Sequence, residues 1–178
     1  DPPEPAWPRL LEEMQKWKDT APALPLMVTT SGIKPFLPAH LDIWAVESPV
    51  YDSLAGKDLL KRSASGGEVW WYVDTVPPRP YGNLLLDFSG IEHRILFWQA
   101  WALGVKGMHY WAVNYAPPER NPWRDALDIT PVNGNGLLVY PGPDGPVDSI
   151  RWECVRNGIE DYDYLALFTN LRRRLAES

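Results

Sequence analysis

Three polar side chains lie at the ends of predicted strands, which is where enzymes built on a parallel sheet have their catalytic residues. Glu47, Asp74 and Asn114 each end a short apolar run, and Tyr115 follows the last of them. The carboxyl ends of parallel strands meet at one edge of a sheet, so we expect these side chains to face one cleft. Glu47 and Asp74 could then form the kind of carboxylate pair that glycosidases use for acid and base catalysis. The alternative is that each carboxylate serves as a cap or forms an ion pair in a loop.

Aromatic side chains are the second possible source of chemistry. The chain has ten Trp and eight Tyr but only four Phe. Indole and phenol rings stack on the apolar faces of sugars, although they also fill cores. Trp70, Trp71 and Tyr72 are consecutive, so they point to both faces of a strand and at least one packs against a helix. The same rule applies to Tyr110 and Trp111, and composition alone does not separate sugar binding from packing.

Several other kinds of chemistry lack their signatures. The sequence has no nucleophile elbow, phosphate-binding loop, zinc-protease motif or Cys-x-x-Cys pair. The 3 His are far apart and the single Cys154 cannot form an internal disulfide, so no metal or other cofactor is expected. A net charge of -6 argues against a nucleic-acid partner. No apolar run approaches the ~20 residues of a membrane span, so no membrane partner is expected, and the cellular location stays open.

Short apolar runs alternate with segments of helical periodicity. The expected strands are residues 25–30, 41–47, 68–74 and 107–114, and the expected helices are residues 6–18, 50–62 and 95–103. Ser89 and Glu92 have the spacing of a capping box before the last of these helices, so Glu92 is expected to cap it. Gly104 is expected to end the same helix.

A long loop and a final helix complete the chain. Loops as long as residues 115–148 are commonly functional. This loop contains the turn-rich residues 133–136 (Asn-Gly-Asn-Gly), and residues 137–140 after them favour a hairpin. From Ser149 the chain is predicted to return to helix, with an interruption near Asn157-Gly158.

Strands that alternate with helices predict an α/β fold with a parallel sheet, either open or closed into a barrel. The connection at residues 31–40 is shorter than a parallel crossover usually needs, so either its helix is reduced to a turn or one flanking strand is wrong. A complete (β/α)₈ barrel typically needs about 250 residues, and this chain has 178. If the barrel is right, residues 1–178 are one part of a larger domain and require the missing N-terminal part of the same protein.

Five motifs, in the right order, carry a resemblance. They are Glu68–Val73 (EVWWYV), Gly90–Trp101 (GIEHRILFWQAW), Tyr110–Tyr115 (YWAVNY), Gly134–Gly142 (GNGLLVYPG) and Ser149–Leu165. As a set they are specific, and together they resemble the C-terminal catalytic region of glycoside hydrolase family 123, also catalogued as domain of unknown function 4091. The resemblance implies a (β/α)₈ TIM barrel of which this chain supplies about strands five to eight.

The resemblance also implies hydrolysis of β-linked N-acetylgalactosamine with retention, by a substrate-assisted mechanism. The 2-acetamido oxygen of the sugar attacks the anomeric carbon, an Asp orients that amide, and an adjacent Glu protonates the leaving oxygen. One carboxyl group must therefore be charged and the other neutral. In the family this Asp-Glu dyad ends the fourth strand, which places it at or just upstream of Asp1. No Glu follows Asp1, so the catalytic acid is not carried over to this sequence.

The strands that remain would supply a wall that binds the sugar. The residues expected in that wall are Glu47, Tyr72, Asp74, Tyr110, Trp111, Asn114, Tyr115 and Trp123. Carboxylates and amides would hydrogen-bond the hydroxyl groups, and a ring would stack below the pyranose. Tyr72 and Tyr110 could instead fill the barrel. Two alternatives stay open: a carbohydrate-binding barrel without catalysis, and a glycosidase for another sugar.

Overall fold

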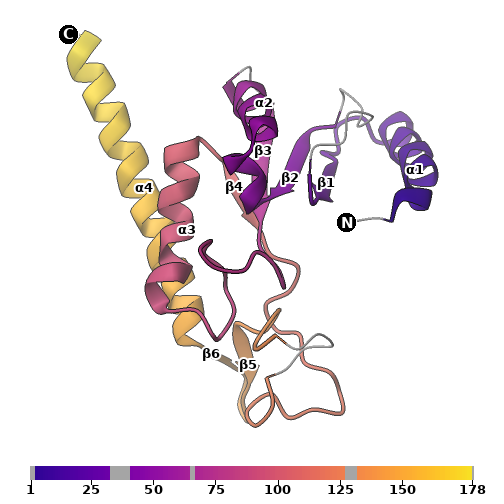
Figure 1. Ribbon diagram of the computed structural model, residues 1–178, viewed down its shortest axis with the longest axis vertical. Coiled ribbons are helices and arrows are strands. Elements are labelled where there is room, and N and C mark those ends of the chain that lie inside the picture. Colours follow the sequence, from indigo (N-terminus) through magenta and orange to yellow (C-terminus); the bar gives the residue numbers. More distant parts are fainter. Residues whose placement is uncertain (1–2, 33–40, 65–66, 127–131, 178) are drawn as a thin grey trace. The chain divides into compact units, whose positions relative to one another are not determined.

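The computed structural model describes residues 3–32, 41–64, 67–126 and 132–177. The chain forms two compact units, whose elements are labelled in Figure 1. The first unit comprises Asp1–Tyr72 and Val105–His109, and the second comprises Val73–Gly104 and Tyr110–Ser178.

A four-stranded parallel sheet is the centre of the first unit. Its strands lie side by side in chain order and all neighbouring pairs are parallel. They are β1 (Met27–Thr30), β2 (Ile43–Glu47), β3 (Glu68–Tyr72) and β4 (Gly107–His109). The predicted α/β fold with a parallel sheet is therefore confirmed.

The fourth strand is shorter than predicted. β4 ends at His109, whereas the sequence predicted a strand that continues to Asn114. Beyond His109 the chain joins the long loop instead, and the Val113 carbonyl accepts a backbone hydrogen bond from Leu138 at 2.7 Å. β-Propensity does not reveal which partner a strand-like segment will find. β3 likewise ends early, at Tyr72.

The short connection between β1 and β2 joins two parallel strands. Met27 lies in register with Ile43, and Thr30 with Val46. The alternative that one of these strands was wrong is thereby excluded. Most of the connection, residues 33–40, lies outside the described residues.

One face of the sheet carries the core of the first unit. Val46 and Trp71 lie in register on neighbouring strands and are both buried. Trp7 and Met14, one face of the amphipathic helix α1, form a buried cluster with Val28 of β1. The helical spacing of these apolar residues is what the sequence predicted for residues 6–18.

Most of the helices follow the predictions, but the helix expected at residues 50–62 is divided between Asp52 and Leu54, and the last helix differs as described below. The helices are η1 (Glu4–Ala6), α1 (Trp7–Thr20), η2 (Ser48–Asp52), α2 (Leu54–Ala64), α3 (Gly90–Leu103) and α4 (Ile150–Glu177). The capping box of α3 is present, and its C-cap Gly104 has a φ of 68°, in the left-handed region that favours glycine. In the described part of the chain, no helix is both long and apolar enough to cross a bilayer.

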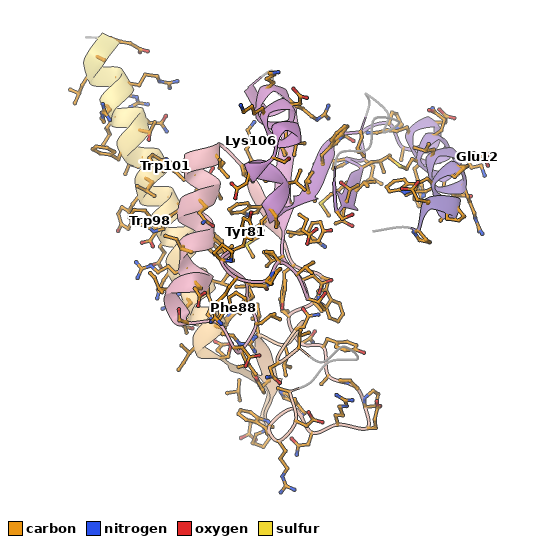
Figure 2. All side chains as sticks on the ribbon, in the orientation of Figure 1. Glu12, Tyr81, Phe88, Trp98, Trp101 and Lys106 are labelled. Carbon is orange, nitrogen blue, oxygen red and sulfur yellow. The ribbon has the colours of Figure 1, made fainter. Side chains whose placement is uncertain are left out.

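In the second unit, α3 and α4 lie side by side (Figure 1). Arg94 of α3 donates two hydrogen bonds to Asp161 of α4, at 2.5 and 2.7 Å. Trp98 of α3, labelled in Figure 2, donates a third from Nε1 at 2.8 Å. The hydrogen bond from Arg94, followed by that from Trp98, lowers the pKa of Asp161 to about 2. Before α4, strands β5 (Val139–Pro141) and β6 (Pro146–Asp148) form the antiparallel hairpin that the sequence favoured.

The predicted interruption of the last helix at Asn157-Gly158 is wrong, because α4 runs without a break through both residues. Gly158 is buried, and a Cβ atom at that position would fall on the ring of Phe97 in α3. The glycine therefore allows a close approach of two helices and does not mark a turn.

Gly158→Ala should destabilise the protein. Intrinsic helix propensity alone would favour alanine by about 1 kcal/mol. Overpacking against the buried Phe97 ring should outweigh that gain and give a net loss of about 1–2 kcal/mol in the free energy of unfolding, measured by denaturant titration. Asn170→Ala, an exposed change on the same helix, is the control and should be neutral or slightly stabilising. A stabilised Gly158→Ala protein would show that the contact with Phe97 does not require glycine.

Candidate functional site

A buried amide in the second unit connects three of the predicted site residues. Asn135 is only 3% exposed. Its Nδ2 donates to Asp74 Oδ1 at 2.8 Å. Its Oδ1 accepts hydrogen bonds from Trp111 Nε1 at 2.9 Å and from the Tyr110 hydroxyl at 3.2 Å. Asn135 therefore fixes a carboxylate and two aromatic side chains relative to one another.

The backbone of Gly136 also holds the Tyr110 side chain and the backbone of Tyr115. The Tyr110 hydroxyl accepts a hydrogen bond from Gly136 N at 2.9 Å, and Tyr115 N donates to the Gly136 carbonyl at 2.8 Å. The Trp111 and Tyr115 rings are in contact, with centroids 4.8 Å apart. Trp111 remains 41% exposed, so part of its ring faces solvent. We refer to Asp74, Tyr110, Trp111, Tyr115 and Asn135 as the Asn135 cluster.

Two glycines shape the turn that presents Asn135. Gly134 and Gly136 have φ values of 71° and 70°, which side chains with a Cβ atom rarely adopt. A Cβ atom on Gly136 would also lie 2.5 Å from the Trp111 ring. The sequence marked these residues as a turn, but Asn135 itself was missed as a candidate. The repeated Asn-Gly pair was its only signal, and that pattern does not show where the amide points.

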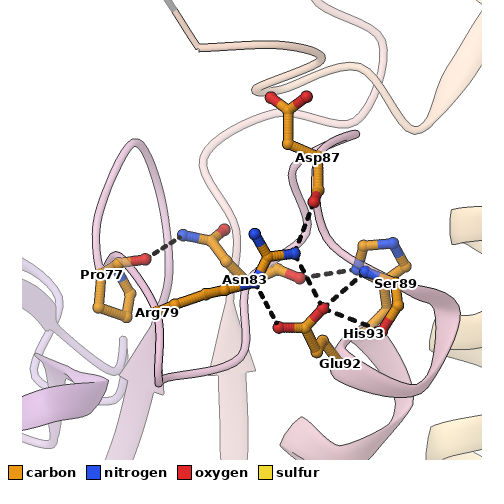
Figure 3. A network of polar contacts seen from close by, with 7 residues as sticks. All are labelled: Pro77, Arg79, Asn83, Asp87, Ser89, Glu92 and His93. Carbon is orange, nitrogen blue, oxygen red and sulfur yellow. Dashed lines mark hydrogen bonds and ion pairs between the residues drawn. The ribbon is translucent and has the colours of Figure 1, made fainter.

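A second buried amide holds the segment that carries Asp74. Asn83 is fully buried, and its Nδ2 donates to the Asp74 carbonyl at 3.0 Å and to the Pro77 carbonyl at 3.1 Å. The Asn83 carbonyl in turn lies 2.7 Å from His93 Nδ1 (Figure 3). Burial lowers the pKa of His93, so its ring is neutral at neutral pH, and Nδ1 must carry the proton because a carbonyl only accepts. His93 therefore positions the loop after β3.

Glu92 has a structural role, as the capping-box interpretation predicted. Its carboxylate accepts hydrogen bonds from Arg79 Nε at 3.1 Å and from the Ser89 backbone N at 2.7 Å (Figure 3). The bond from Arg79, followed by that from Ser89, lowers the pKa of Glu92 to about 2. A carboxylate held ionised in this way does not donate a proton at neutral pH.

Glu47 and Tyr72 belong to the first unit. They lie in register at the carboxyl ends of β2 and β3, and Tyr72 lies in register with His109 at the end of β4. Side chains in register share a face of the sheet, so these three form a row on the face opposite the buried core. In the same face a Cβ atom on Gly107 would fall on the Trp70 ring. His109 was missed because the sequence predicted that β4 continued beyond it.

The structure places the other two predicted residues in different contacts. Asn114 is exposed, and its backbone forms an isolated antiparallel bridge with Leu137. Trp123 is also exposed, donates from Nε1 to the Pro141 carbonyl at 2.8 Å, and packs its ring against Tyr140 with centroids 4.9 Å apart. Trp123 therefore lies along the β5 strand.

Trp111 is the most exposed member of the Asn135 cluster. A hollow of about 10 Å³ lies beside the cluster, lined by Tyr115, Arg120, Asn135 and Leu137 among others. That volume holds about one water molecule and does not enclose a sugar ring. A half-exposed indole beside a carboxylate and an amide can instead bind a ligand that has both an apolar face and hydroxyl groups.

Comparison with solved structures gives a fold relationship. A family 123 glycoside hydrolase from Clostridium perfringens, whose structure was analysed for the details of glycolipid glycan hydrolysis, aligns with a TM-score of 0.58 and 17% sequence identity. The alignment covers 75% of this chain but 23% of the Clostridium chain, so this chain spans about a quarter of its length. A search of curated proteins gives no match.

Comparison with family models gives the family itself. The model of the glycoside hydrolase 123 catalytic domain matches residues 16–168, which is most of the chain. All five motifs that carried the resemblance lie within this match. The chain therefore belongs to glycoside hydrolase family 123, through the catalytic domain of that family.

Proposed function

We propose that this chain is part of a glycosidase that hydrolyses β-linked N-acetylgalactosamine with retention, by the substrate-assisted mechanism described above. The family supports glycoside hydrolysis and hence a carbohydrate substrate. The observation that carries the finer proposal is the Asn135 cluster, in which an exposed ring, a carboxylate and an amide are fixed side by side.

The cluster offers the two kinds of contact that a pyranose needs. The exposed part of Trp111 supplies an apolar face for stacking. Asp74 Oδ1 is occupied by Asn135, and no further hydrogen bond to Oδ2 occurs within the described part of the chain. Asp74 Oδ2 is therefore proposed to accept a hydrogen bond from a sugar hydroxyl. Glu47, Tyr72, Asn114 and Trp123 also stay predicted sugar contacts.

The order of the strands supports a barrel. In open doubly wound sheets the strand order reverses at a switch point, whereas β1 to β4 follow the chain without reversal. We propose that they are about strands five to eight of a (β/α)₈ barrel, closed by further strands of the same longer protein along the edges of β1 and β4. The catalytic Asp-Glu dyad is proposed at or just before Asp1, which lies outside the described residues.

The test is hydrolysis by the intact protein that contains this chain. Its substrates are the 4-nitrophenyl β-glycosides of N-acetylgalactosamine, N-acetylglucosamine and galactose. We expect N-acetylgalactosaminide to be preferred, the first product to be the β-anomer by NMR, and a thiazoline analogue of the oxazolinium to inhibit. Faster turnover of another glycoside would contradict the sugar assignment. Binding of N-acetylgalactosamine by calorimetry without any turnover would favour a carbohydrate-binding barrel.

A further inference from the structure

Arg151, near the start of α4, is a buried cation that contacts the turn on both sides of Asn135. The side chain is 4% exposed. Its Nη1 donates to the Gly134 carbonyl at 2.8 Å, and its Nη2 donates to the Leu137 carbonyl. These two carbonyls flank Asn135 and Gly136, so the guanidinium spans the base of the turn that presents the amide.

The same guanidinium reaches the segment that carries Asp74. Nη1 also donates to the Leu84 carbonyl at 2.6 Å. Leu84 follows Asn83, whose amide group binds the Asp74 carbonyl. Arg151 therefore links the two backbone segments from which Asp74 and Asn135 come, and these two side chains meet at 2.8 Å.

The partners of Arg151 are unusual for a buried arginine. In the described part of the chain its acceptors are the carbonyls of Leu84, Gly134 and Leu137 and the Tyr140 hydroxyl, all of them neutral. Burial of a charge is costly when no opposite charge compensates it. A planar group with donors in fixed directions can hold several carbonyls at set positions, which the ammonium group of lysine cannot reproduce.

We propose that Arg151 is a positioning residue for ligand binding: it sets the place of Asn135 and, through it, of Trp111 and Asp74, without touching the sugar. This inference rests on the proposed function for its effect on catalysis. Its structural half, that the Trp111 hydrogen bond depends on Arg151, can be measured without any substrate.

The substrate-free experiment compares two indole groups in the intact protein. Trp111 Nε1 donates to Asn135 and Trp98 Nε1 donates to Asp161, and both tryptophans are part-exposed, at 41% and 45%. Their Nε1–H signals are assigned in NMR spectra from Trp111→Phe and Trp98→Phe proteins. In Arg151→Lys we expect the Trp111 indole proton to exchange with solvent at least about tenfold faster, while Trp98 is unchanged.

Kinetics of the same proteins give the second readout. If Trp111 and Asp74 hold the sugar equally in the ground and transition states, Arg151→Lys raises KM by about tenfold with kcat changed less than about threefold. Arg156→Lys, an exposed arginine on the same helix, is the matched control and should change neither readout. Arg151→Met should show the same direction as lysine, with a larger effect.

The outcomes separate the two proposals. Faster Trp111 exchange with a raised KM supports both of them. Faster Trp111 exchange with unchanged kinetics supports the link from Arg151 to Trp111 but contradicts sugar binding by the Asn135 cluster. Equal acceleration of Trp98 and Trp111 shows that Arg151 serves stability alone, and no change at Trp111 shows that its hydrogen bond does not depend on Arg151. Either result overturns the inference.

Discussion

Asn135→Ala should lower kcat/KM for the N-acetyl-β-galactosaminide by about 100-fold in the intact protein, mainly through KM. The change removes the hydrogen bonds from Trp111 and Tyr110 and the one donated to Asp74. Each buried polar group left without its partner costs about 1–3 kcal/mol, and about 2.7 kcal/mol corresponds to 100-fold. Steady-state kinetics together with denaturant unfolding separate this loss of binding from a loss of folded protein.

The same turn supplies a matched control. Asn133 lies two positions earlier, but its Nδ2 donates to the carboxylate of Asp87, at 3.2 and 3.0 Å. Asn133→Ala should therefore leave kcat/KM within about threefold, since it touches the turn and not the cluster. Equal losses in both variants would show that the turn as a whole matters, and that the amide of Asn135 has no special part. Asp74→Ala combined with Asn135→Ala should be clearly less than additive, because the two side chains share one hydrogen bond.

Local signals in the sequence were sufficient to predict most of the strands and helices. The apolar runs gave the four parallel strands, and the capping box with Gly104 gave both ends of α3. These signals act over a few residues, so they survive without knowledge of tertiary contacts. Gly158 shows the limit of this approach. Its role in α4 depends on Phe97 of another helix, which no local pattern reveals.

Local signals also predicted part of the candidate site, but not the contacts that depend on the folded loop. Asp74, Tyr110, Trp111 and Tyr115 were found because strand ends and aromatic rings are visible in the sequence, and the structure brings them together. The residue that connects them was not found. Asn135 lies within the long loop, and its inward amide is set by the positive φ of the glycines on both sides and by Tyr110. Such a contact is a property of the folded turn and not of its composition.

Trp111→Ala should reduce kcat/KM by about 100-fold or more, because it removes the exposed ring on which the sugar is proposed to stack as well as the hydrogen bond to Asn135. Stacking on an aromatic face and the lost indole hydrogen bond each contribute about 1–2 kcal/mol. Trp111→Phe keeps an aromatic ring and loses only the hydrogen bond, so about a tenfold reduction is expected. Calorimetry with N-acetylgalactosamine should show the same order in Kd.

Trp98→Phe is the matched control for the two Trp111 variants. Trp98 is exposed to a similar extent and also loses one hydrogen bond, the one to Asp161 between α3 and α4. Because that contact joins two helices and is unrelated to the Asn135 cluster, Trp98→Phe should affect unfolding and leave kcat/KM within about twofold. If Trp111→Ala binds the sugar as tightly as the unmodified protein, the exposed indole face is not where the pyranose rests. The carboxylates would then have to hold the substrate without a stacking partner from this tryptophan, and the proposed role of the cluster would fail.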